Sequence, residues 1–194
     1  MEQQLTRLAD FIYEATMLKA TPRSGFAFLG TGSESVADHS YGAAVAGYVL
    51  GLMAKANASH VVLLCLFHDL HEAATGDFNY VNHRYDKCDA NAAMQDACKG
   101  SGIGDSILPL WQEFEESQTL EARLARDADQ IDLISALRRQ LAAGNQFAAE
   151  WLKSAVARLI TPAGRQLCEA IMATDPAHWW YDQVDQSWWV NRNG

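Results

Sequence analysis

Proline, cysteine and basic side chains are all scarce in this sequence. Its 194 residues include only 4 prolines, 4 cysteines and 15 lysines and arginines, against 24 aspartates and glutamates, which gives a net charge of −9. The cysteines form no CxxC pair and no regular spacing, a pattern typical of reduced thiols in the cytosol and not of a disulfide framework. The excess of acid argues against a nucleic-acid polymer or an anionic membrane surface as partner, although one or two arginines could still hold a small anionic ligand.

Segments that would direct the chain into a membrane or out of the cell are also missing. The start, MEQQLTRLADFIYEA, lacks a basic stretch followed by an apolar run, and no uninterrupted apolar stretch approaches the roughly 18 residues of a membrane span. We therefore expect a cytoplasmic protein with no membrane partner. A composition of 49% apolar and 20% charged residues is typical of a globular chain, and we expect one domain over 1–194.

The spacing of apolar residues predicts an all-α architecture, because prolines and β-branched runs are few and alanines are many. One apolar segment, Val61–Phe67, fits either a buried parallel strand or a buried helix. We favour the helix because Ser59 can cap its start, LHEAA continues it, and Gly76 suits the position after its end. The other expected helices cover about 4–19, 36–56, 88–99, 105–116, 119–143, 146–159, 163–173 and 176–189, with a loop at about 76–87.

Two histidines beside aspartates stand in apolar surroundings. His68-Asp69 ends the apolar run, where burial of an imidazole and a carboxylate is costly unless something compensates. A divalent metal would compensate, since imidazole and carboxylate suit Mn, Fe, Co or Zn and, less well, Mg. The alternative is a helix end that emerges into solvent. Asp38-His39 lies in another apolar helix, where a hydrogen-bonded core histidine is the alternative to a ligand.

Three aspartates, Asp127, Asp129 and Asp132, follow on one predicted helix among apolar residues. At about 100° per residue, both Asp127 and Asp129 fall on broad apolar stripes. The periodicity therefore leaves open which carboxylate points inward, and a solvated acidic face is the alternative to a functional role.

Together, His39, His68-Asp69 and an aspartate near 129 follow the order and approximate spacing of the HD-domain metal-dependent phosphohydrolases. The sequence around them resembles one branch closely, the small HD-domain 5′-deoxynucleotidases, which remove the phosphate from deoxynucleoside monophosphates. The similar segments occur in family order over about 130 residues: LKATPRSGF at 18–26, ESVADHS at 34–40, HDLHEAATGD at 68–77, DADQIDLI at 127–134 and AAGNQF at 142–147.

The resemblance implies a compact multi-helix HD fold with its metal-site core at about 34–145 and the helices of 146–189 packed on it. It implies one divalent metal, whether Mn, Co, Zn, Fe or Mg, and AAGN places the last ligand on Asp129. The ligands implied are His39, His68, Asp69 and Asp129. Such a metal lowers the pKa of bound water and neutralises phosphate charge, while a nearby carboxylate manages the proton. The resemblance gives the proton-handling and water-orienting roles to Glu72 and Asp77.

Two residues near the N-terminus match the substrate side of the family. Arg23 matches the phosphate-binding arginine, which makes bidentate contacts that a lysine could not. Phe26 stands where the family usually places a tryptophan against the nucleoside, and packing is its alternative role.

One segment departs from the family pattern. After Gly76-Asp77 the family commonly continues with a proline-rich segment that ends in a lysine near the phosphate, whereas this chain reads FNYVNHRY. His83 and Arg84 are the candidates to replace that lysine. The alternative interpretation is that both side chains are exposed on the surface and have no role in the site. We expect a different pocket wall here.

The leading hypothesis is a hydrolase of deoxynucleoside 5′-monophosphates. A deoxynucleoside triphosphate triphosphohydrolase is the second enzyme reading, but it needs more cationic groups than the motifs offer. Another phosphate ester as substrate and a metal- or nucleotide-binding module without turnover remain further alternatives. The resemblance also implies a homodimer, and the pairs Trp179-Trp180 and Trp188-Trp189 fit either a helix docked on the core or a dimer contact.

Overall fold

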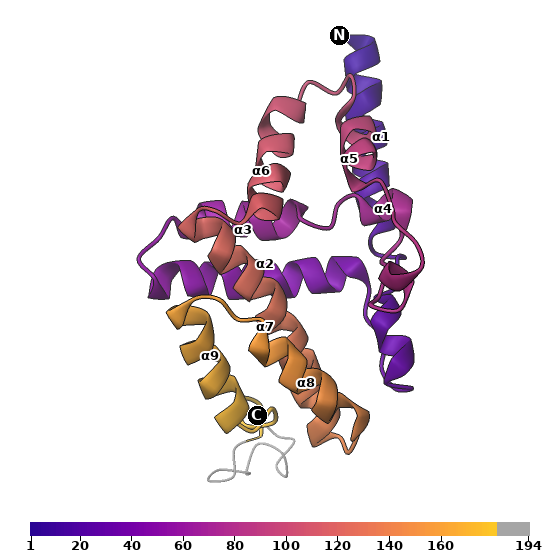
Figure 1. Cartoon of the computed structure of the whole chain (residues 1–194). Helices are drawn as coiled ribbons and strands as arrows, with labels where there is room; N and C mark the ends of the chain where they lie inside the picture. Colours follow the sequence, from indigo (N-terminus) through magenta and orange to yellow (C-terminus); the bar gives the residue numbers. More distant parts are fainter. Residues whose placement is uncertain (182–194) are drawn as a thin grey trace, which may run out of the picture.

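Two apolar helices, α2 (Val36–Met53) and α3 (Ala58–Phe67), lie side by side at the centre of the fold (Figure 1). Small residues let them approach closely, since a Cβ at Gly51 would lie 2.6 Å from the Cα of Ala58. The helix α7 (Leu120–Ala142) crosses the pair and packs on both members (Figure 1). These three helices bring together the segments that the sequence singles out for chemistry.

The structure is a computed structural model that describes residues 1–181. The remaining helices are α1 (Glu2–Met17), α4 (Glu72–Thr75), α5 (Ala90–Cys98), α6 (Gly104–Glu116), α8 (Phe147–Ala157) and α9 (Pro162–Ala173). Two short 3-10 turns, Ser24–Phe28 and Asn82–Arg84, lie in the connections. The described residues form no β-strand beyond an isolated bridge, so the all-α class is confirmed. Within this part of the chain, no helix combines the length and the apolar character that a membrane crossing requires.

Within residues 1–181 the buried apolar side chains form two clusters, and the segments of interest lie where these clusters meet. The larger cluster joins α2, α3, α7, α8 and α9, and the smaller one joins α1, α4, α5 and α6. On α2, Val36 belongs to the smaller cluster and Ala43 to the larger one, with His39 between them. Cys65 and Leu70 flank His68-Asp69 in the same way.

Most helices lie where the sequence predicts them, with ends that differ by a few residues. The helical interpretation of Val61–Phe67 is correct, but Asn57, not Ser59, caps its start. The expected continuation through LHEAA is wrong, because residues 68–71 form turns with i→i+3 hydrogen bonds before α4 begins. The helix expected over 176–189 is also wrong as far as it is described, since 176–180 form turns, while Trp188-Trp189 lie outside the described residues.

Asp127 is a structural residue. Its fully buried carboxylate accepts hydrogen bonds from the backbone amides of Ile160 at 2.7 Å and Thr161 at 2.8 Å, and from the Thr161 hydroxyl. Thr161 in turn caps α9 by accepting a hydrogen bond from the amide of Gly164. Asp127 therefore fixes the start of α9 against α7.

We expect Asp127→Ala to lower the free energy of unfolding by about 3 kcal/mol, because it leaves the two buried donors of Thr161 and the partly buried amide of Ile160 without their acceptor. Urea unfolding followed by circular dichroism measures this change. Thr161→Ala removes one of these donors and the α9 cap, and should cost about 1 kcal/mol. Equal stability of Asp127→Ala and wild type would contradict the structural role.

Candidate metal and phosphate site

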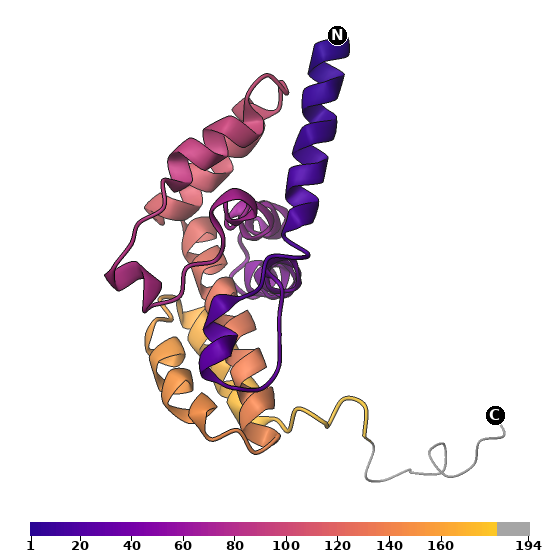
Figure 2. The same ribbon diagram turned by 90° about the vertical axis from the view of Figure 1, so that its right-hand side faces the viewer.

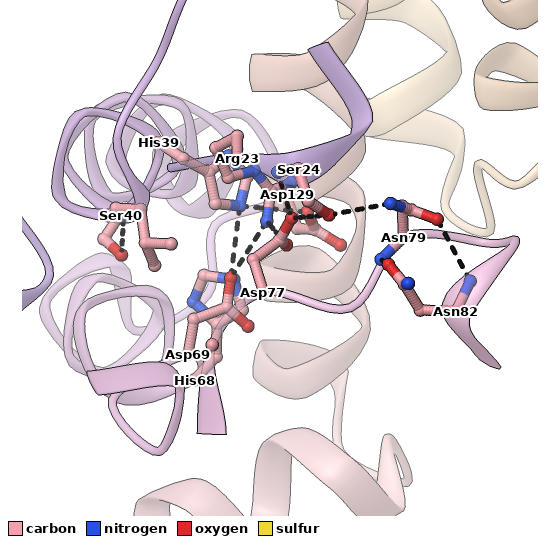
Figure 3. A network of polar contacts seen from close by, with 12 residues as sticks. Arg23, Ser24, His39, Ser40, His68, Asp69, Asp77, Asn79, Asn82 and Asp129 are labelled. Carbon is pink, nitrogen blue, oxygen red and sulfur yellow. Dashed lines mark hydrogen bonds and ion pairs between the residues drawn. The ribbon is translucent and has the colours of Figure 1, made fainter. Parts of the chain in front are cut away.

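Four side chains from three segments converge at the junction of the two clusters (Figure 3). His39 lies in the first turns of α2, His68 and Asp69 follow the end of α3, and Asp129 lies on α7. Nitrogen or oxygen atoms of His39, His68 and Asp129 all lie within 4.8 Å of one another. The Oδ2 atom of Asp69 lies 3.1 Å from His68 Nε2 and 3.7 Å from His39 Nε2. The structure thus brings the four predicted ligands together.

The two imidazole rings are each held through Nδ1. His68 Nδ1 donates to the backbone carbonyl of Cys65 at 2.7 Å, and His39 Nδ1 donates to Asp132 Oδ2 at 2.7 Å. Both Nε2 atoms are buried and face carboxylates: His39 Nε2 lies 3.2 Å from Asp129 Oδ1, and His68 Nε2 lies 3.1 Å from Asp69 Oδ2. Metal-ligating histidines have this arrangement, with one nitrogen bonded to a carbonyl or carboxylate and the other turned toward the ion and its remaining ligands.

Asp132 reaches His39 because α2 has a glycine one turn further on. A Cβ at Gly42 would collide with the Asp132 carboxylate, so only glycine leaves space for it there. Asp132 is thus a positioning residue for His39.

The charges of the site favour a cation. Burial alone would raise the pKa of Asp129, but the hydrogen bond and the charge of His39 lower it to about 2. The pKa of Asp69 is also lowered against the effect of burial, by His68, His39 and Arg23. Burial and Arg23 oppose protonation of His39, yet Asp129 and Asp132 raise its pKa to about 10. Two imidazoles and two carboxylates that remain ionised form a donor set that fits a divalent metal, and binding of the metal would displace the proton that His39 holds at neutral pH.

Arg23 and Asp77 lie beside this group. Arg23 Nη1 lies 3.1 Å from Asp77 Oδ1 and 3.4 Å from Asp69 Oδ2. The other oxygen of Asp77 accepts hydrogen bonds from the Ser24 amide at 2.6 Å and from the Ser24 hydroxyl at 2.8 Å (Figure 3). Asp77 therefore anchors the segment that carries Arg23, an arrangement that the sequence reading did not anticipate.

Glu72 is buried at the edge of the site, and its Oε2 has no hydrogen-bond partner among the described residues. Burial, together with the negative charges of Asp69 and Asp77, raises the pKa of Glu72 to about 9. A carboxyl group in this environment holds a proton at neutral pH and can give it up to a stronger base.

A cavity of about 310 Å³ opens over these groups. Of the predicted residues, its wall includes Arg23, Phe26, Asp69, Glu72, Asp77, His83 and Asp129. Arg84 is not among the lining residues, and its guanidinium lies over the ring of Tyr85, 5.7 Å from the centroid. His71 packs its ring edge-on to Trp111, away from the converging ligands.

The sequence reading missed Arg126, Gln130, Tyr80 and Trp151, which also line the cavity. Helical spacing could have found Arg126, because it lies three residues before Asp129 on α7 and shares its side of the helix, whereas Gln130 points about 100° away from Asp129. No comparable signal marks Trp151, which reaches the cavity because α8 packs on α7. Gly25 makes room for it, since a Cβ there would lie 2.5 Å from Cη2 of Trp151.

Comparison with known proteins identifies the family of the chain. A family model described as an HD domain matches residues 15–163. The 5′-deoxynucleotidase HDDC2 of Dictyostelium discoideum is 29% identical over 143 residues, which cover 67% of this chain and 75% of that protein. The protein of the same name from Xenopus laevis is 30% identical over 137 residues, 66% of each chain.

Solved structures show the same fold. A conserved hypothetical protein from Pyrococcus furiosus superposes with a TM-score of 0.73 and 25% identity, over 86% of this chain and 99% of that one. A protein from Magnetospirillum magnetotacticum, described as a predicted metal-dependent phosphohydrolase, gives a TM-score of 0.63 at 20% identity, over 88% and 91% of the chains. The second likeness shows the fold alone.

We expect Asp132→Ala to weaken binding of Mn²⁺ or Zn²⁺ about 10- to 100-fold, because His39 loses the acceptor that orients its ring. Competition with a chelator measures the affinity. Asp132→Asn keeps an oxygen acceptor and should recover part of the loss. The matched control is Asp127→Asn on the same helix, which should lower stability and leave metal affinity unchanged. Equal losses of metal affinity in the Asp127 and Asp132 variants would contradict the assignment.

Proposed function

Because the chain belongs to the HD-domain family of metal-dependent phosphohydrolases, we propose that it removes the 5′-phosphate from deoxynucleoside monophosphates. The observation that carries the proposal is the convergence of the buried Nε2 atoms of His39 and His68 on the carboxylates of Asp129 and Asp69, next to Arg23. The names of the relatives at 29% and 30% identity support the same substrate class.

In this proposal His39, His68, Asp69 and Asp129 hold one divalent metal, whether Mn, Co, Zn, Fe or Mg. When bound, the metal lowers the pKa of a water and neutralises phosphate charge. Arg23 binds non-bridging phosphate oxygens through its guanidinium, which Asp77 holds in place. Glu72, whose buried Oε2 has no hydrogen-bond partner among the described residues, handles the proton that the leaving 5′ oxygen takes up.

The cations at the cavity favour a monophosphate over a triphosphate. Among the described residues, Arg23, Arg126 and His83 are the basic side chains that line it. Arg23 already shares its charge with Asp69 and Asp77. Arg126 is bonded to the carbonyl of Phe114 at 3.2 Å and to the carboxylate of Glu115 at 3.1 Å. Little positive charge is left to bind the β- and γ-phosphates of a triphosphate. Hydrolysis of deoxynucleoside triphosphates is therefore the second candidate activity.

The aromatic side of the cavity suits a nucleobase. Phe26, Tyr80 and Trp151 line it, and the rings of Tyr80 and Trp151 lie 6.4 Å apart, edge to face. A volume of about 310 Å³ lies at the small end of the range for ligand pockets, which suits one nucleoside and one phosphate. In this proposal Trp151 does for the base what the tryptophan that the family usually has at the position of Phe26 would do.

Product analysis tests the reaction. Protein stripped of metal and reloaded with Mn, Co, Mg or Zn should release inorganic phosphate from deoxynucleoside monophosphates. His68→Ala and Asp129→Ala should reduce turnover at least about 1,000-fold, since both remove ligands of the proposed metal. Release of triphosphate from deoxynucleoside triphosphates would contradict the monophosphatase proposal and favour the triphosphohydrolase. Bound but unchanged nucleotide after long incubation with metal would indicate a binding module.

A truncation of Trp151 tests the place of the base. We expect Trp151→Leu to raise the KM for a deoxynucleoside monophosphate about 10-fold, because stacking of a base on an aromatic ring is worth roughly 1–3 kcal/mol. The KM for deoxyribose 5-phosphate, which has no base, should stay the same. Phe147→Leu, on the exposed start of the same helix, is the control and should change neither value. Equal effects of Trp151→Leu on both substrates would place the base elsewhere.

A further inference from the structure

The side chain of Gln130 on α7 lies between a carboxylate and a guanidinium at the wall of the cavity. Its Nε2 donates to Asp129 Oδ2 at 2.9 Å, and its Oε1 accepts a hydrogen bond from Arg158 Nε at 2.7 Å. An ionised carboxylate only accepts and a guanidinium only donates, so the two partners fix which end of the amide faces which group. Gln130 therefore directs an N–H group at a proposed metal ligand, although the two residues leave the helix about 100° apart.

The hydrogen bond from Gln130 assigns separate tasks to the two oxygens of Asp129. Oδ2 is held by Gln130, while Oδ1 lies 3.2 Å from His39 Nε2, on the side of the converging ligands. The terminal torsion of an aspartate side chain is broad, so an unrestrained carboxylate could turn and exchange its two oxygens. Carboxylates that ligate metals are commonly hydrogen-bonded in this way, and loss of such a partner weakens metal binding.

Arg158 follows the last turn of α8, seven residues after Trp151 and therefore on the same side of that helix. Its guanidinium lies over the ring of Tyr80, with Cζ 5.0 Å from the centroid, which is a cation–π contact. Figure 2 shows the connection between α4 and α5, which carries Tyr80, beside α8. Tyr80 and Trp151 both line the cavity, so Arg158 packs against its aromatic side.

The contacts of Arg158 are few and specific. Its side chain is partly buried, no carboxylate within residues 1–181 forms an ion pair with it, and its buried Nη2 has no hydrogen-bond partner there. A cation in such surroundings costs free energy unless something compensates it. The contacts that remain, one with Gln130 and one with Tyr80, make Arg158 a link between the amide and the aromatic ring.

We propose that Gln130 and Arg158 are positioning residues for the metal, because together they hold the Asp129 carboxylate in the orientation that binds the ion. Through Tyr80 the same contacts connect this ligand to the wall where the base would lie. The inference rests on the metal site of the proposed function, and it is independent of which phosphate ester the protein hydrolyses. Metal affinity should then depend on side chains that never touch the metal.

Competition with a chelator for Mn²⁺ or Zn²⁺, measured on the full-length protein without substrate, tests this role. Gln130→Met removes the donor while the length of the side chain stays nearly the same, and it should weaken metal binding about 10- to 100-fold. Arg158→Leu leaves the Gln130 amide free to turn and should weaken binding about 3- to 10-fold. Arg158→Lys keeps a donor for Gln130 and should recover part of that loss.

Arg165→Leu is the matched control for Arg158→Leu. Arg165 carries the same side chain on the next helix, and its guanidinium donates to backbone carbonyls at 2.9 Å and 2.6 Å, outside the site. This variant should lower the free energy of unfolding and leave the metal affinity unchanged. Circular dichroism and urea unfolding of each variant separate a loss of fold from a loss of metal binding.

Substitutions of Tyr80 test the connection to the aromatic wall. Tyr80→Leu removes the ring beneath Arg158 and should weaken metal binding about 2- to 5-fold, whereas Tyr80→Phe keeps the ring and should bind the metal as wild type does. In a Gln130→Met background, Tyr80→Leu should have no further effect, because the path from the ring to Asp129 is already interrupted. A further loss of the same size in that background would overturn the connection.

The outcome for the wild type separates this inference from the proposed function. A wild type that binds the metal, together with a Gln130→Met variant that binds it equally well, would overturn the positioning role and leave the proposed function intact. A wild type that binds no divalent metal would overturn both. Equal losses of affinity in Arg158→Leu and Arg165→Leu would also contradict the positioning role, because metal affinity would then follow stability alone.

Discussion

The imidazole rings of His39 and His68 are each held through Nδ1 by an oxygen acceptor, and this fixed orientation turns both Nε2 atoms toward Asp69 and Asp129. His39 Nε2 lies 3.2 Å from Asp129 Oδ1 and His68 Nε2 lies 3.1 Å from Asp69 Oδ2, so two imidazoles and two carboxylates are gathered within one small, largely buried site. Burial of polar and charged groups costs free energy unless something compensates it. A divalent cation would compensate it, because imidazole nitrogen and carboxylate oxygen are ligands that such a cation takes.

Helix α7 organises this site by assigning different partners to three carboxylates. Asp129 and Asp132 are three residues apart, so they share one side of the helix and both reach His39, at Nε2 and Nδ1 respectively. Asp127 lies on the other side, about 200° from Asp129, and bonds to the start of α9. The same helix therefore fixes the ligand, the ring that faces it and the packing of the C-terminal helices.

The sequence predicted much of the fold because apolar periodicity and capping residues act locally. It could not choose between Asp127 and Asp129, because both fall on buried stripes and only the neighbouring helix decides their roles. The resemblance to a family placed the ligand on Asp129, and the structure brings that residue to the two histidines. The prediction of one continuous helix through residues 68–71 was wrong. Good helix formers occur there, but tertiary packing holds the segment in turns, which carry His68 and Asp69.

Contacts between elements that are distant in the chain could not be predicted from the sequence either. Trp151 lies more than a hundred residues from Gly25, and nothing in either local sequence indicates that the indole fills the space left by the missing side chain. The sequence likewise indicates only a turn at Gly76-Asp77. In the structure, however, the Asp77 carboxylate accepts hydrogen bonds from Arg23 and from the amide of Ser24 across the site. Such residues become visible only when packing has placed their partners.

The balance of charge links the metal to the phosphate. Asp69, Asp77 and Asp129 face the cavity, and the carboxylates outnumber the free positive charge because Arg23 is paired with two of them. A phosphate dianion that approaches this wall meets net negative charge, and at short range in a partly buried site that repulsion amounts to several kcal/mol. In the proposed site, a divalent cation held by His39, His68, Asp69 and Asp129 would reverse this sign. It would also compete with Arg23 for Asp69, which lies 3.4 Å from the guanidinium, and so would leave Arg23 freer to bind phosphate oxygens.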